Sequence, residues 1–543
     1  MSILDFFPFN EIRPQQKKIL LDIESNWSKY KYFAFNAATG IGKSAIAMTV
    51  SEFTENSFIT CPLKSLQRQY MRDIDNMRSE GNPHAIKYHY LMGKSNYPCI
   101  RDSYNMCDSC IHVTGKSGET ISKCPMRSEC TYQIEKAETI RAPIAVVNNH
   151  VLWFCKFKTR DLLVIDEAHR IEEFLMNTVS VNFTPDSCIR DRMVNSKMKQ
   201  SEMVPIVAEQ FIKLKEEYDE TIGTIEELSG HEPNSTEIAR LSKRIFTVET
   251  KMSIMQSISE NYLEFFPEPD LKINKMIIKP IKAHKWAHKL LHQGNKVLLL
   301  SATLPNKEQF CRQYNIPEEE MFYSNEFEFP IFPINNRVVI MDTKTPNLKG
   351  MFKKTKEEKE NIMKRQVMIF DKLFEKLSRE KECKALVITH TNDIMSSFFT
   401  YSKYKNIMIE CSSRKILKNE EDSENGLESV VPQQAVETHK KRTGNSILIG
   451  PQLYEGLDLP EHRLIVMCKV PKQPWTDRVA CREHEDPGWY ESETVLKIIQ
   501  GPGRVFRGPK DKAAILLLDR DFEVYWGKSR IQKHFPSINF WTL

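Results

Sequence analysis

One short segment of the chain runs from an apolar stretch through a glycine-containing loop into a helical pattern: Phe33-Ala34-Phe35-Asn36-Ala37-Ala38-Thr39-Gly40-Ile41-Gly42-Lys43-Ser44. Strand, loop and helix in this order are typical of a phosphate-binding loop, whose backbone N–H groups and helix N-terminus face a polyphosphate. We expect Lys43 to reach the outer phosphates and Ser44 to be a magnesium ligand. Ala37 stands where the usual pattern has its first glycine, and alanine is acceptable there if its φ stays negative. The segment predicts a nucleotide-binding protein.

Length and composition indicate a soluble multidomain protein. The 543 residues predict about three or four domains. Hydrophobic residues make up 41% and charged residues 27% of the chain, and no apolar run approaches the roughly 18 residues of a membrane helix. The first residues, Met1 to Asp5, lack the basic region of a signal peptide. We expect a monomeric protein without membrane contact in the cytoplasm, or in the nucleus of a eukaryote.

Charge permits nucleic-acid binding but does not establish it. The net charge is +5 and the pI is near 8.4, which is modest for a nucleic-acid-binding protein. Lys64 and Gln67 follow the predicted strand Phe58–Cys61 and are candidate contacts to a nucleic-acid backbone, or simply a solvated helix start. Lysines between Lys272 and Lys289, with Trp286 among them, either follow a phosphate backbone or form a solvated face.

Five of the thirteen cysteines lie within 32 residues: Cys99, Cys107, Cys110, Cys124 and Cys130. The surrounding sequence has little apolar periodicity, so it cannot bury much core. Four thiolates around a metal centre would supply the missing organisation, because metal binding can itself drive the folding of a small module. A single C-x-x-C pair does not identify the metal as zinc. The alternative is a set of unrelated buried or reactive thiols.

A second apolar run, Leu162–Ile165, ends in Asp166-Glu167-Ala168-His169. Downstream of a phosphate loop, such an acidic pair suits phosphoryl transfer to water. We expect Asp166 to bind Mg²⁺ through water and Glu167 to orient and deprotonate the attacking water. The alternative is a strand that ends in two surface carboxylates.

The remaining sequence predicts helices followed by a second parallel sheet. Residues 181 to about 275 carry apolar stripes of an antiparallel helical pair. The strand Val297–Leu304 follows, and the hydroxyls of Ser301 and Thr303 near its end are candidates to sense the nucleotide. Further buried runs alternate with helical spacers and are predicted as strands: Val338–Met341, Ala385–Thr389, Ser446–Gly450, Leu464–Met467 and Ala514–Asp519.

Two arginines near the end of the chain, Arg504 and Arg507, lie three residues apart, on one face if the segment is helical. From a second domain they could reach the γ-phosphate, where an arginine finger contributes on the order of 10³ to 10⁵ in rate. The alternative is a pair of surface arginines.

Together these motifs resemble the XPD and DinG family of superfamily 2 DNA helicases over nearly the whole chain. The family's motifs occur in order: motif I at Ala37–Ser44, Ia at Thr60–Gln69, the DEAH box at Asp166–His169, III at Ser301–Leu304, V at Glu455–Asp458 and VI at Gln500–Arg507. The resemblance implies that Arg13 and Gln16 read the adenine, that Asp458 contacts the nucleotide, and that Gln500 belongs to the catalytic set.

The resemblance also implies an inserted iron-sulfur domain with a [4Fe–4S] cluster. Cys99 and Cys130 match its beginning and its end; since four cysteines suffice, Cys107, Cys110 and Cys124 compete for two places. The expected organisation is two RecA-like α/β domains with two insertions: helicase domain 1 at 1–98, 139–180 and 276–325, the iron-sulfur domain at 99–138, a helical arch domain at 181–275, and helicase domain 2 at 326–543.

The function implied by the resemblance is an ATP- and Mg²⁺-dependent DNA helicase in DNA repair. It would move 5′ to 3′ on single-stranded DNA and use the iron-sulfur domain as a wedge at forked DNA. Two other functions fit the same motifs: an ATP-gated DNA-binding scaffold subunit without productive unwinding, and an RNA-directed ATPase. A fused nuclease is not expected, because the chain begins directly at the adenine-reading segment.

Overall fold

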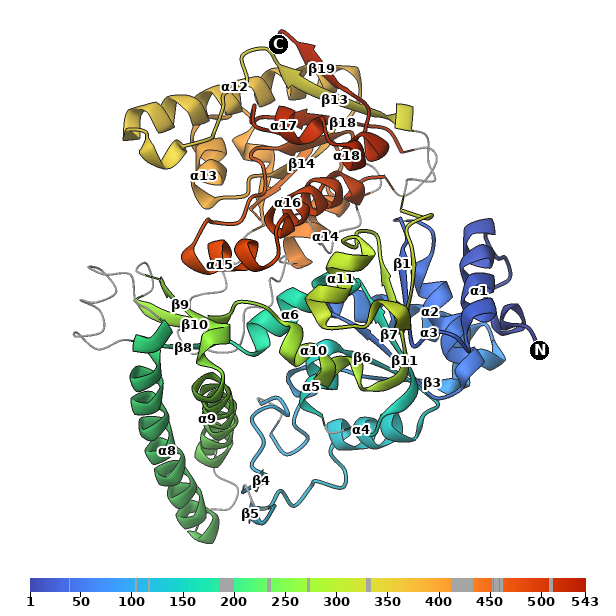
Figure 1. The fold of residues 1–543 in the computed structure, drawn as a ribbon, viewed down its shortest axis with the longest axis vertical. Coiled ribbons are helices and arrows are strands. Elements are labelled where there is room, and N and C mark those ends of the chain that lie inside the picture. Colours follow the sequence, from blue (N-terminus) through green and yellow to red (C-terminus); the bar gives the residue numbers. More distant parts are fainter. Residues whose placement is uncertain are drawn as a thin grey trace.

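The computed structural model describes residues 1–38, 40–102, 105–115, 118–155, 157–184, 200–231, 236–270, 274–328, 334–411, 433–451, 453, 459, 462–506 and 511–543. Its main bodies are two seven-stranded parallel sheets with helices packed against them, one above the other in Figure 1. The prediction of two α/β domains with parallel sheets is therefore confirmed. Within the described residues, none of the helices has the length and apolar character of a membrane span.

The first sheet forms the first domain. Its strands, in sheet order, are β12 (Met321–Ser324), β1 (Tyr32–Asn36), β11 (Gly294–Ser301), β7 (Arg160–Asp166), β2 (Ser57–Cys61), β6 (Ile144–Asn148) and β3 (Tyr88–Leu91). Its helices are α1 (Pro14–Asn26), α2 (Lys43–Thr54), α3 (Lys64–Ser79), α4 (Thr131–Arg141), α5 (Asn149–Phe154), α6 (Ile171–Thr178), α10 (His284–Leu291) and α11 (Lys307–Tyr314).

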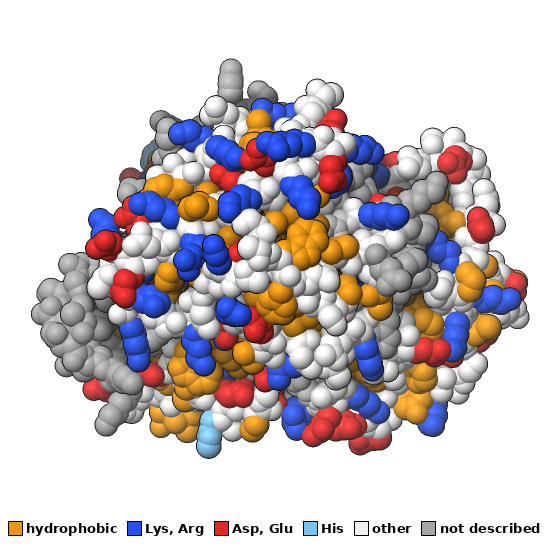
Figure 2. Space-filling view, turned by 90° about the horizontal axis from the view of Figure 1, so that it is seen from above, with side chains coloured by type: hydrophobic (Ala, Val, Ile, Leu, Met, Phe, Trp, Pro, Cys, Tyr) orange, Lys and Arg blue, Asp and Glu red, His pale blue; other side chains and the backbone are white. Residues whose placement is uncertain are grey.

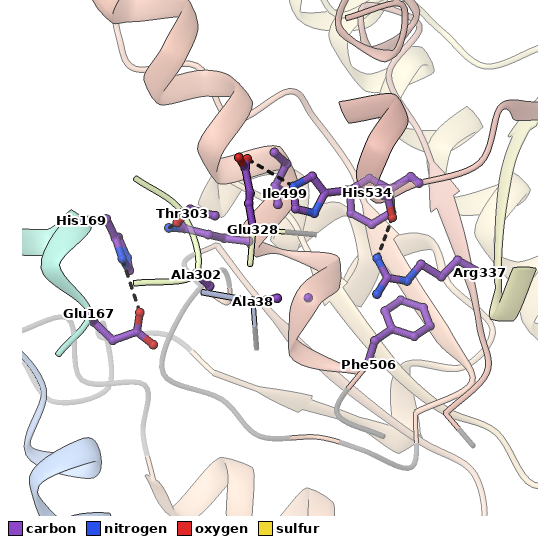
Figure 3. A pocket seen from close by; sticks show the side chains of 13 residues that line it. Ala38, Glu167, His169, Ala302, Thr303, Glu328, Arg337, Ile499, Phe506 and His534 are labelled. Carbon is purple, nitrogen blue, oxygen red and sulfur yellow. Dashed lines mark hydrogen bonds and ion pairs between the residues drawn. The ribbon is translucent and has the colours of Figure 1, made fainter. Parts of the chain in front are cut away.

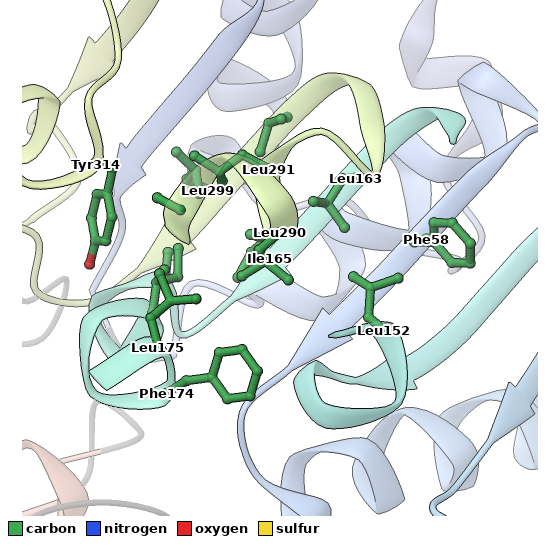
Figure 4. Close-up of a cluster of buried hydrophobic side chains, with 14 of the residues drawn as sticks. Phe58, Leu152, Leu163, Ile165, Phe174, Leu175, Leu290, Leu291, Leu299 and Tyr314 are labelled. Atoms are coloured by element: carbon green, nitrogen blue, oxygen red, sulfur yellow. The ribbon is translucent and has the colours of Figure 1, made fainter. Parts of the chain in front are cut away.

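The central strands of this sheet are buried on both faces. Along β1, Tyr32 and Ala34 join one apolar cluster, part of which is drawn in Figure 4. Phe33 and Phe35 join a second cluster on the opposite face. Side chains that alternate between two cores explain why these strands are continuous apolar runs in the sequence.

The second sheet forms the second domain and repeats this construction. Its strands, in sheet order, are β15 (Met408–Glu410), β16 (Ser446–Gly450), β14 (Lys384–Ile388), β17 (Leu464–Met467), β18 (Ala513–Leu517), β13 (Arg337–Asp342) and β19 (Ile538–Trp541). Its helices are α12 (Lys356–Glu380), α13 (Asn392–Tyr401), α14 (Gln433–Lys441), α15 (Asp477–Glu485), α16 (Trp489–Gln500), α17 (Phe522–Trp526) and α18 (Ser529–His534).

The sequence did not predict the edge strands of the two sheets, namely β3, β12, β15 and β19. Each has only three or four residues, and each includes partly exposed positions. Because an edge strand is paired on one side only, it needs no long apolar run, and it therefore lacks the sequence signal of the central strands.

A helical hairpin, formed by α8 (Gln200–His231) and α9 (Thr236–Glu260), projects from the first domain at the lower left of Figure 1. The predicted pair of helices is thus present. The prediction of helix throughout 181–275 is wrong at both ends, where β8 (Val181–Phe183), β9 (Phe265–Asp270) and β10 (Lys275–Pro280) form a small antiparallel sheet. Its strands alternate buried and partly exposed residues, a period-2 pattern that favours a half-exposed strand.

The Cys-rich segment, residues 99–138, lies between this hairpin and the first domain. Its only regular strands among the described residues are β4 (Val113–Thr114) and β5 (Thr120–Ser122). Ile111, Val113 and Cys124 share an apolar cluster with residues of α8 and α9. The segment therefore obtains much of its burial from neighbouring elements, as its weak apolar periodicity suggested.

A buried cation, Arg160, links several elements of the first domain. From the start of β7 its guanidinium donates to the carbonyls of Ser57, Thr139, Ala142 and Pro143 at 2.8 to 3.0 Å. Burial lowers its pKa to about 10. The side chain thus joins the C-terminal end of α4 to strands β2 and β7.

Replacing Arg160 by Met should lower the free energy of unfolding by about 3 kcal/mol or more, because several buried carbonyls lose a charged donor. Arg141→Met is the matched control, since Arg141 is exposed and pairs with Glu138 one turn away, a pair that contributes about 0 to 1 kcal/mol. Chemical denaturation measures both. Equal destabilisation by the two substitutions would contradict this role.

Candidate active site

The phosphate loop connects β1 to α2 as predicted. Gly40 has φ of 89° and Gly42 has φ of 88°, in the left-handed region that favours glycine. Ala37 is not among the residues with positive φ, so the alanine at this position is compatible with the loop. Its N–H donates to the Ser301 carbonyl at 2.6 Å, and that of Ala38 donates to the Phe327 carbonyl at 2.8 Å. The loop is therefore anchored to the end of β11 and to the segment after β12.

Side chains from the start of α1 hold the loop from the other side. The Arg13 guanidinium donates to the Gly40 carbonyl, and Gln16 Nε2 donates to the Gly42 carbonyl at 3.4 Å. A Cβ atom on Gly42 would lie 2.4 Å from that amide nitrogen, which can move because it ends a flexible side chain, so it is the φ of 88° that requires glycine here. Lys43 folds over the loop, with Nζ 3.4 Å from the Ala37 carbonyl. Recognition of adenine by Arg13 and Gln16 stays a prediction.

The carboxylate of Asp166 is buried at the end of β7, beside the loop. Its pKa is raised to about 6, first by burial and then by the charge of Glu167, against the lowering effect of Lys43 and of two hydrogen bonds. The Tyr70 hydroxyl donates to Asp166 Oδ2 at 2.8 Å, and the backbone N–H of Glu167 donates to Oδ1 at 2.9 Å. Tyr70 also contacts the Ser44 hydroxyl. The two predicted magnesium-binding side chains therefore meet at one tyrosine.

Tyr70 was missed by the sequence reasoning. It lies in the middle of α3, one residue beyond the segment assigned to motif Ia, and its ring is part of the apolar core. The available signal was general: a buried tyrosine hydroxyl needs a polar partner. Nothing in the sequence identified that partner as Asp166.

A chain of polar contacts connects Glu167 to the second domain. Glu167 adopts a left-handed backbone with φ of 53°, and its carboxylate lies 3.4 Å from His169 Nδ1. That nitrogen is 2.7 Å from Ser301 Oγ, which accepts the N–H of Thr303 at 3.1 Å. Gln500 Nε2, at the end of α16, donates to Thr303 Oγ1 at 2.6 Å. Ser301 and Thr303 were predicted as sensing residues, and they occupy the link between the domains.

The two domains enclose a pocket at this link (Figure 3). Ala38, Glu167, His169 and Thr303 line it from the first domain, and Gln500, Gly503 and Phe506 line it from the second.

Ionic contacts surround the pocket. Glu328, which follows β12, accepts from Arg530 Nε of α18 at 2.6 Å and lies 3.5 Å from His534 Nε2. Arg337 donates to the His534 carbonyl at 2.6 Å and covers the ring of Phe506 (Figure 3). From the sequence, Phe506 was singled out only as part of motif VI and the other four residues were not, because the two halves of each contact are far apart in the chain.

Some predicted site residues lie outside the described part of the chain. Thr39, Asp458 and Arg507 are in this group. Arg504 lies in the short turn η12 (Pro502–Arg504), directly after α16, and only its backbone is described. This turn places the predicted arginine segment beside the pocket, but not as a continuation of α16.

Four of the five clustered cysteines lie close together. Cys107 Sγ is 3.8 Å from Cys130 Sγ, and these two residues with Cys110 line a second pocket that also contains Lys94, His112 and Arg127. The pKa of Cys107 is raised to about 12, first by burial and then by Cys130, Cys99 and Cys110. Within the described residues, no three metal-ligating side chains converge as they would around a single ion.

The candidate nucleic-acid contacts have structural partners. Gln67 is fully buried, and its amide donates to the Leu91 carbonyl at 2.8 Å, so its prediction as a backbone contact is wrong. Lys282 pairs with Glu485 and Lys285 with Glu264. Lys289 lies over the ring of Trp153. This stretch therefore resembles the solvated, paired face that was the alternative.

Two family models match parts of the chain. A model described as a helicase C-terminal domain matches residues 374–538, and one described as type III restriction enzyme, res subunit, matches residues 9–189. A probable ATP-dependent helicase of Methanocaldococcus jannaschii is 26% identical over 215 residues. That match covers 34% of this chain and 32% of the other protein, about a third of its length.

Several solved structures share the fold over almost the whole chain. An XPD helicase is 17% identical, with a TM-score of 0.66, and the match covers 98% of this chain and 100% of that one. An apo XPD structure is 15% identical with a TM-score of 0.59, and covers 98% and 100%. Xpd4 of S. tokodaii is 14% identical with a TM-score of 0.54, and covers 97% and 100%. At sequence identities this low, the similarity shows a shared fold and no more.

The substitution Asp166→Asn should stabilise the nucleotide-free protein at pH 8. Because the folded pKa of Asp166 is about 6 against an ordinary 3.8, the ionised carboxylate disfavours folding above pH 6, by at most about 3 kcal/mol. The stabilisation should shrink as the pH falls below 6, where the wild-type carboxyl takes up a proton.

Thermal unfolding in EDTA at pH 8 and pH 5 measures this difference. Asp161→Asn, at the exposed start of the same strand, is the control and should raise the melting temperature at neither pH. A destabilised Asp166→Asn protein at pH 8 would be the opposite of the expected result.

Proposed function

We propose that the chain, an XPD/DinG-like helicase of superfamily 2 by fold and sequence match, is an ATP-dependent DNA helicase in DNA repair. It moves 5′ to 3′ on single-stranded DNA and unwinds forked DNA. The observation that supports this most is the convergence of four groups at one edge of the first sheet. These groups are the phosphate loop, Asp166, Glu167 and, from the second domain, Gln500.

ATP fits this site because each side chain has a distinct task there. Lys43 neutralises the outer phosphate oxygens. Ser44 and Asp166, which both contact the Tyr70 hydroxyl, would hold Mg²⁺. Mg²⁺, when bound, supplies positive charge that favours the ionised form of Asp166 and offsets charge on the phosphates. Glu167 orients the attacking water and takes its proton.

The second domain completes the site. Arg504 and Arg507 stabilise the charge that develops on the γ-phosphate, and Gln500 reports the closure of the domains to Thr303. Repeated opening and closing of the pocket moves the two sheets relative to each other along the bound strand. Hydrolysis is in this way coupled to translocation.

The nucleic acid is bound by shape and local contacts more than by overall charge. On the face shown in Figure 2, Lys and Arg side chains lie among acidic and hydrophobic ones. Some lysines of the chain pair with neighbouring carboxylates, as Lys364 does with Glu360 and Lys403 with Glu375. A net charge of +5 is consistent with a strand that lies in a local groove.

We also propose that the Cys-rich segment holds a [4Fe–4S] cluster. The pocket lined by Cys107, Cys110 and Cys130 fits such a group better than a single ion, because the four irons of a cluster each take one thiolate and so keep the ligands apart. Cys99 is among the charges that act on Cys107. The charges of Cys110 and Cys99 also act on Cys124, but Cys124 packs in the apolar cluster with α8 and α9 and does not line this pocket. Cys99, Cys107, Cys110 and Cys130 are therefore the proposed ligands, and Cys124 is the spare.

Lys43→Ala should abolish DNA-stimulated ATP hydrolysis and strand displacement on a forked duplex, because the phosphates lose their main cation. Lys29→Ala, on the exposed end of the loop before β1, is the control and should keep both activities. Full activity of Lys43→Ala would refute the proposal. Hydrolysis without displacement by the wild type would favour the scaffold subunit, and stimulation by RNA in place of DNA would favour the RNA-directed ATPase.

Protein purified without oxygen should be brown, and Cys130→Ala should lose the visible absorbance because the cluster loses a ligand. Cys124→Ala should keep it. Unwinding should fall more than hydrolysis in Cys130→Ala. A colourless wild type with stoichiometric zinc would contradict the cluster, and loss of absorbance in Cys124→Ala would contradict the ligand assignment.

A further inference from the structure

Helix α16 of the second domain contacts the first domain at both of its ends, next to the acidic segment Asp166–His169. Its last residue, Gln500, donates to Thr303. Its first residue, Trp489, donates through Nε1 to Glu172 Oε2 at 3.4 Å. A helix of 12 residues is a rigid rod about 18 Å long. A movement of the second domain therefore acts on both contacts together.

Glu172 lies in the first turn of α6, which begins where the turn η4 (Ala168–Arg170) ends. That turn carries His169, whose Nδ1 faces both Glu167 and Ser301. Any displacement of the start of α6 is thus passed directly to the acidic segment. No function was assigned to Glu172 from the sequence.

The carboxylate of Glu172 is bound by both domains. Arg482 of α15 approaches Oε1 with Nη2 at 3.1 Å, and Gln313 of α11 donates to Oε2. The backbone N–H of Glu172 donates to the Tyr314 hydroxyl at 3.2 Å, and Tyr314 stands beside α6 in Figure 4. Tyr314 and Gln313 fix Glu172 within the first domain, while Arg482 and Trp489 attach it to the second.

The guanidinium of Arg482 is completely buried. Nη2 also lies 3.5 Å from Asp486, which pairs with Arg312 of α11 at 3.1 Å. Within the described residues, Nε, Nη1 and Nη2 have no hydrogen-bond acceptor, so the contacts of Nη2 with Glu172 and Asp486 are ion pairs without hydrogen-bond geometry. Glu172 and Asp486 are therefore both counter-charges of Arg482. Separation of the domains would leave Asp486 beside Arg482 but would take the buried Glu172 carboxylate away from its cation, which is strongly unfavourable.

The surroundings of this pair are poorly solvated. Glu493, in the middle of α16, has its pKa raised to about 7, first by burial and then by the charge of Glu172. Charges interact more strongly in such surroundings than at an exposed surface. The Glu172–Arg482 pair thus favours one defined arrangement of the two domains.

We infer that Glu172 is a positioning residue for ATP hydrolysis. Through Arg482 and Trp489 it transmits the closure of the second domain to the acidic segment, and so holds Glu167 in place only while the domains are closed. The inference rests on the proposed ATPase function. It adds a second point of control to the Gln500–Thr303 contact.

Glu172→Gln tests the inference, because the amide keeps the size of the side chain but removes its charge. We expect kcat for DNA-stimulated ATP hydrolysis to fall about tenfold to a hundredfold, while KM for ATP changes by less than about twofold. Glu173→Gln is the matched control: the next residue on α6 is exposed and pairs with Arg170 within the first domain, so its kcat should equal that of the wild type.

A double variant separates coupling from general damage. Arg482→Met alone leaves the Glu172 charge buried and unpaired, so it should be slower than Glu172→Gln; combining both substitutions should restore kcat at least about threefold relative to Arg482→Met. If the loss of kcat in the double variant equals the product of the losses in the two single variants, the inference is overturned. An unchanged kcat in Glu172→Gln would overturn it as well, even with a lower melting temperature.

If Glu172→Gln does not fold, Trp489→Phe carries the test, because it removes the N–H donor and keeps the ring against Arg482. A kcat reduced about threefold at unchanged KM supports the inference, and an unchanged kcat overturns it. A wild type without ATPase activity would instead refute the proposed function itself.

Discussion

A carboxylate buried at the end of a central strand is the constraint on which the rest of the site depends. Burial disfavours the ionised form of Asp166, whose pKa is raised to about 6 even with the groups that compensate its charge. The compensation comes from Tyr70 on α3, from the backbone N–H of Glu167 and from Lys43 after the phosphate loop. Three separate chain segments meet at this point because β1, β7 and β2 are parallel and end at the same edge of the sheet.

The same edge is also where the second domain touches the first. Gln500 reaches Thr303, and Arg530 reaches Glu328 and the Leu304 carbonyl. Each of these contacts joins a side chain of one domain to the segment that follows a strand of the other. The pocket of Figure 3 therefore depends on the relative position of the domains. A rigid-body movement of the second domain changes the whole pocket, and in this way a two-domain frame can couple a nucleotide to motion.

The Cys-rich segment and the helical hairpin form a second structural unit at the side of the first domain (Figure 1). Ile111 and Val113 pack against α8 and α9, while Cys107 and Tyr132 pack into the core of the first domain. Ser242 of α9 donates to the Cys110 carbonyl at 2.6 Å. Whatever group the cysteines hold is thus connected both to the hairpin and to the sheet that carries the phosphate loop.

The sequence alone determined the elements whose signal is local. The need for positive φ predicts the two phosphate-loop glycines. Continuous apolar runs predict the buried central strands, and apolar periodicity predicts the two long helices. Only the tertiary structure decided the rest, because contact partners that are distant in the chain leave no local pattern. Tyr70 has a role in the site because the fold brings its hydroxyl to Asp166, and Glu172 has its proposed role because the fold brings it to Arg482. Gln67, in contrast, cannot contact a nucleic acid as predicted, because the fold buries it. Short edge strands such as β3 and β19 likewise exist only because a sheet is present for them to join.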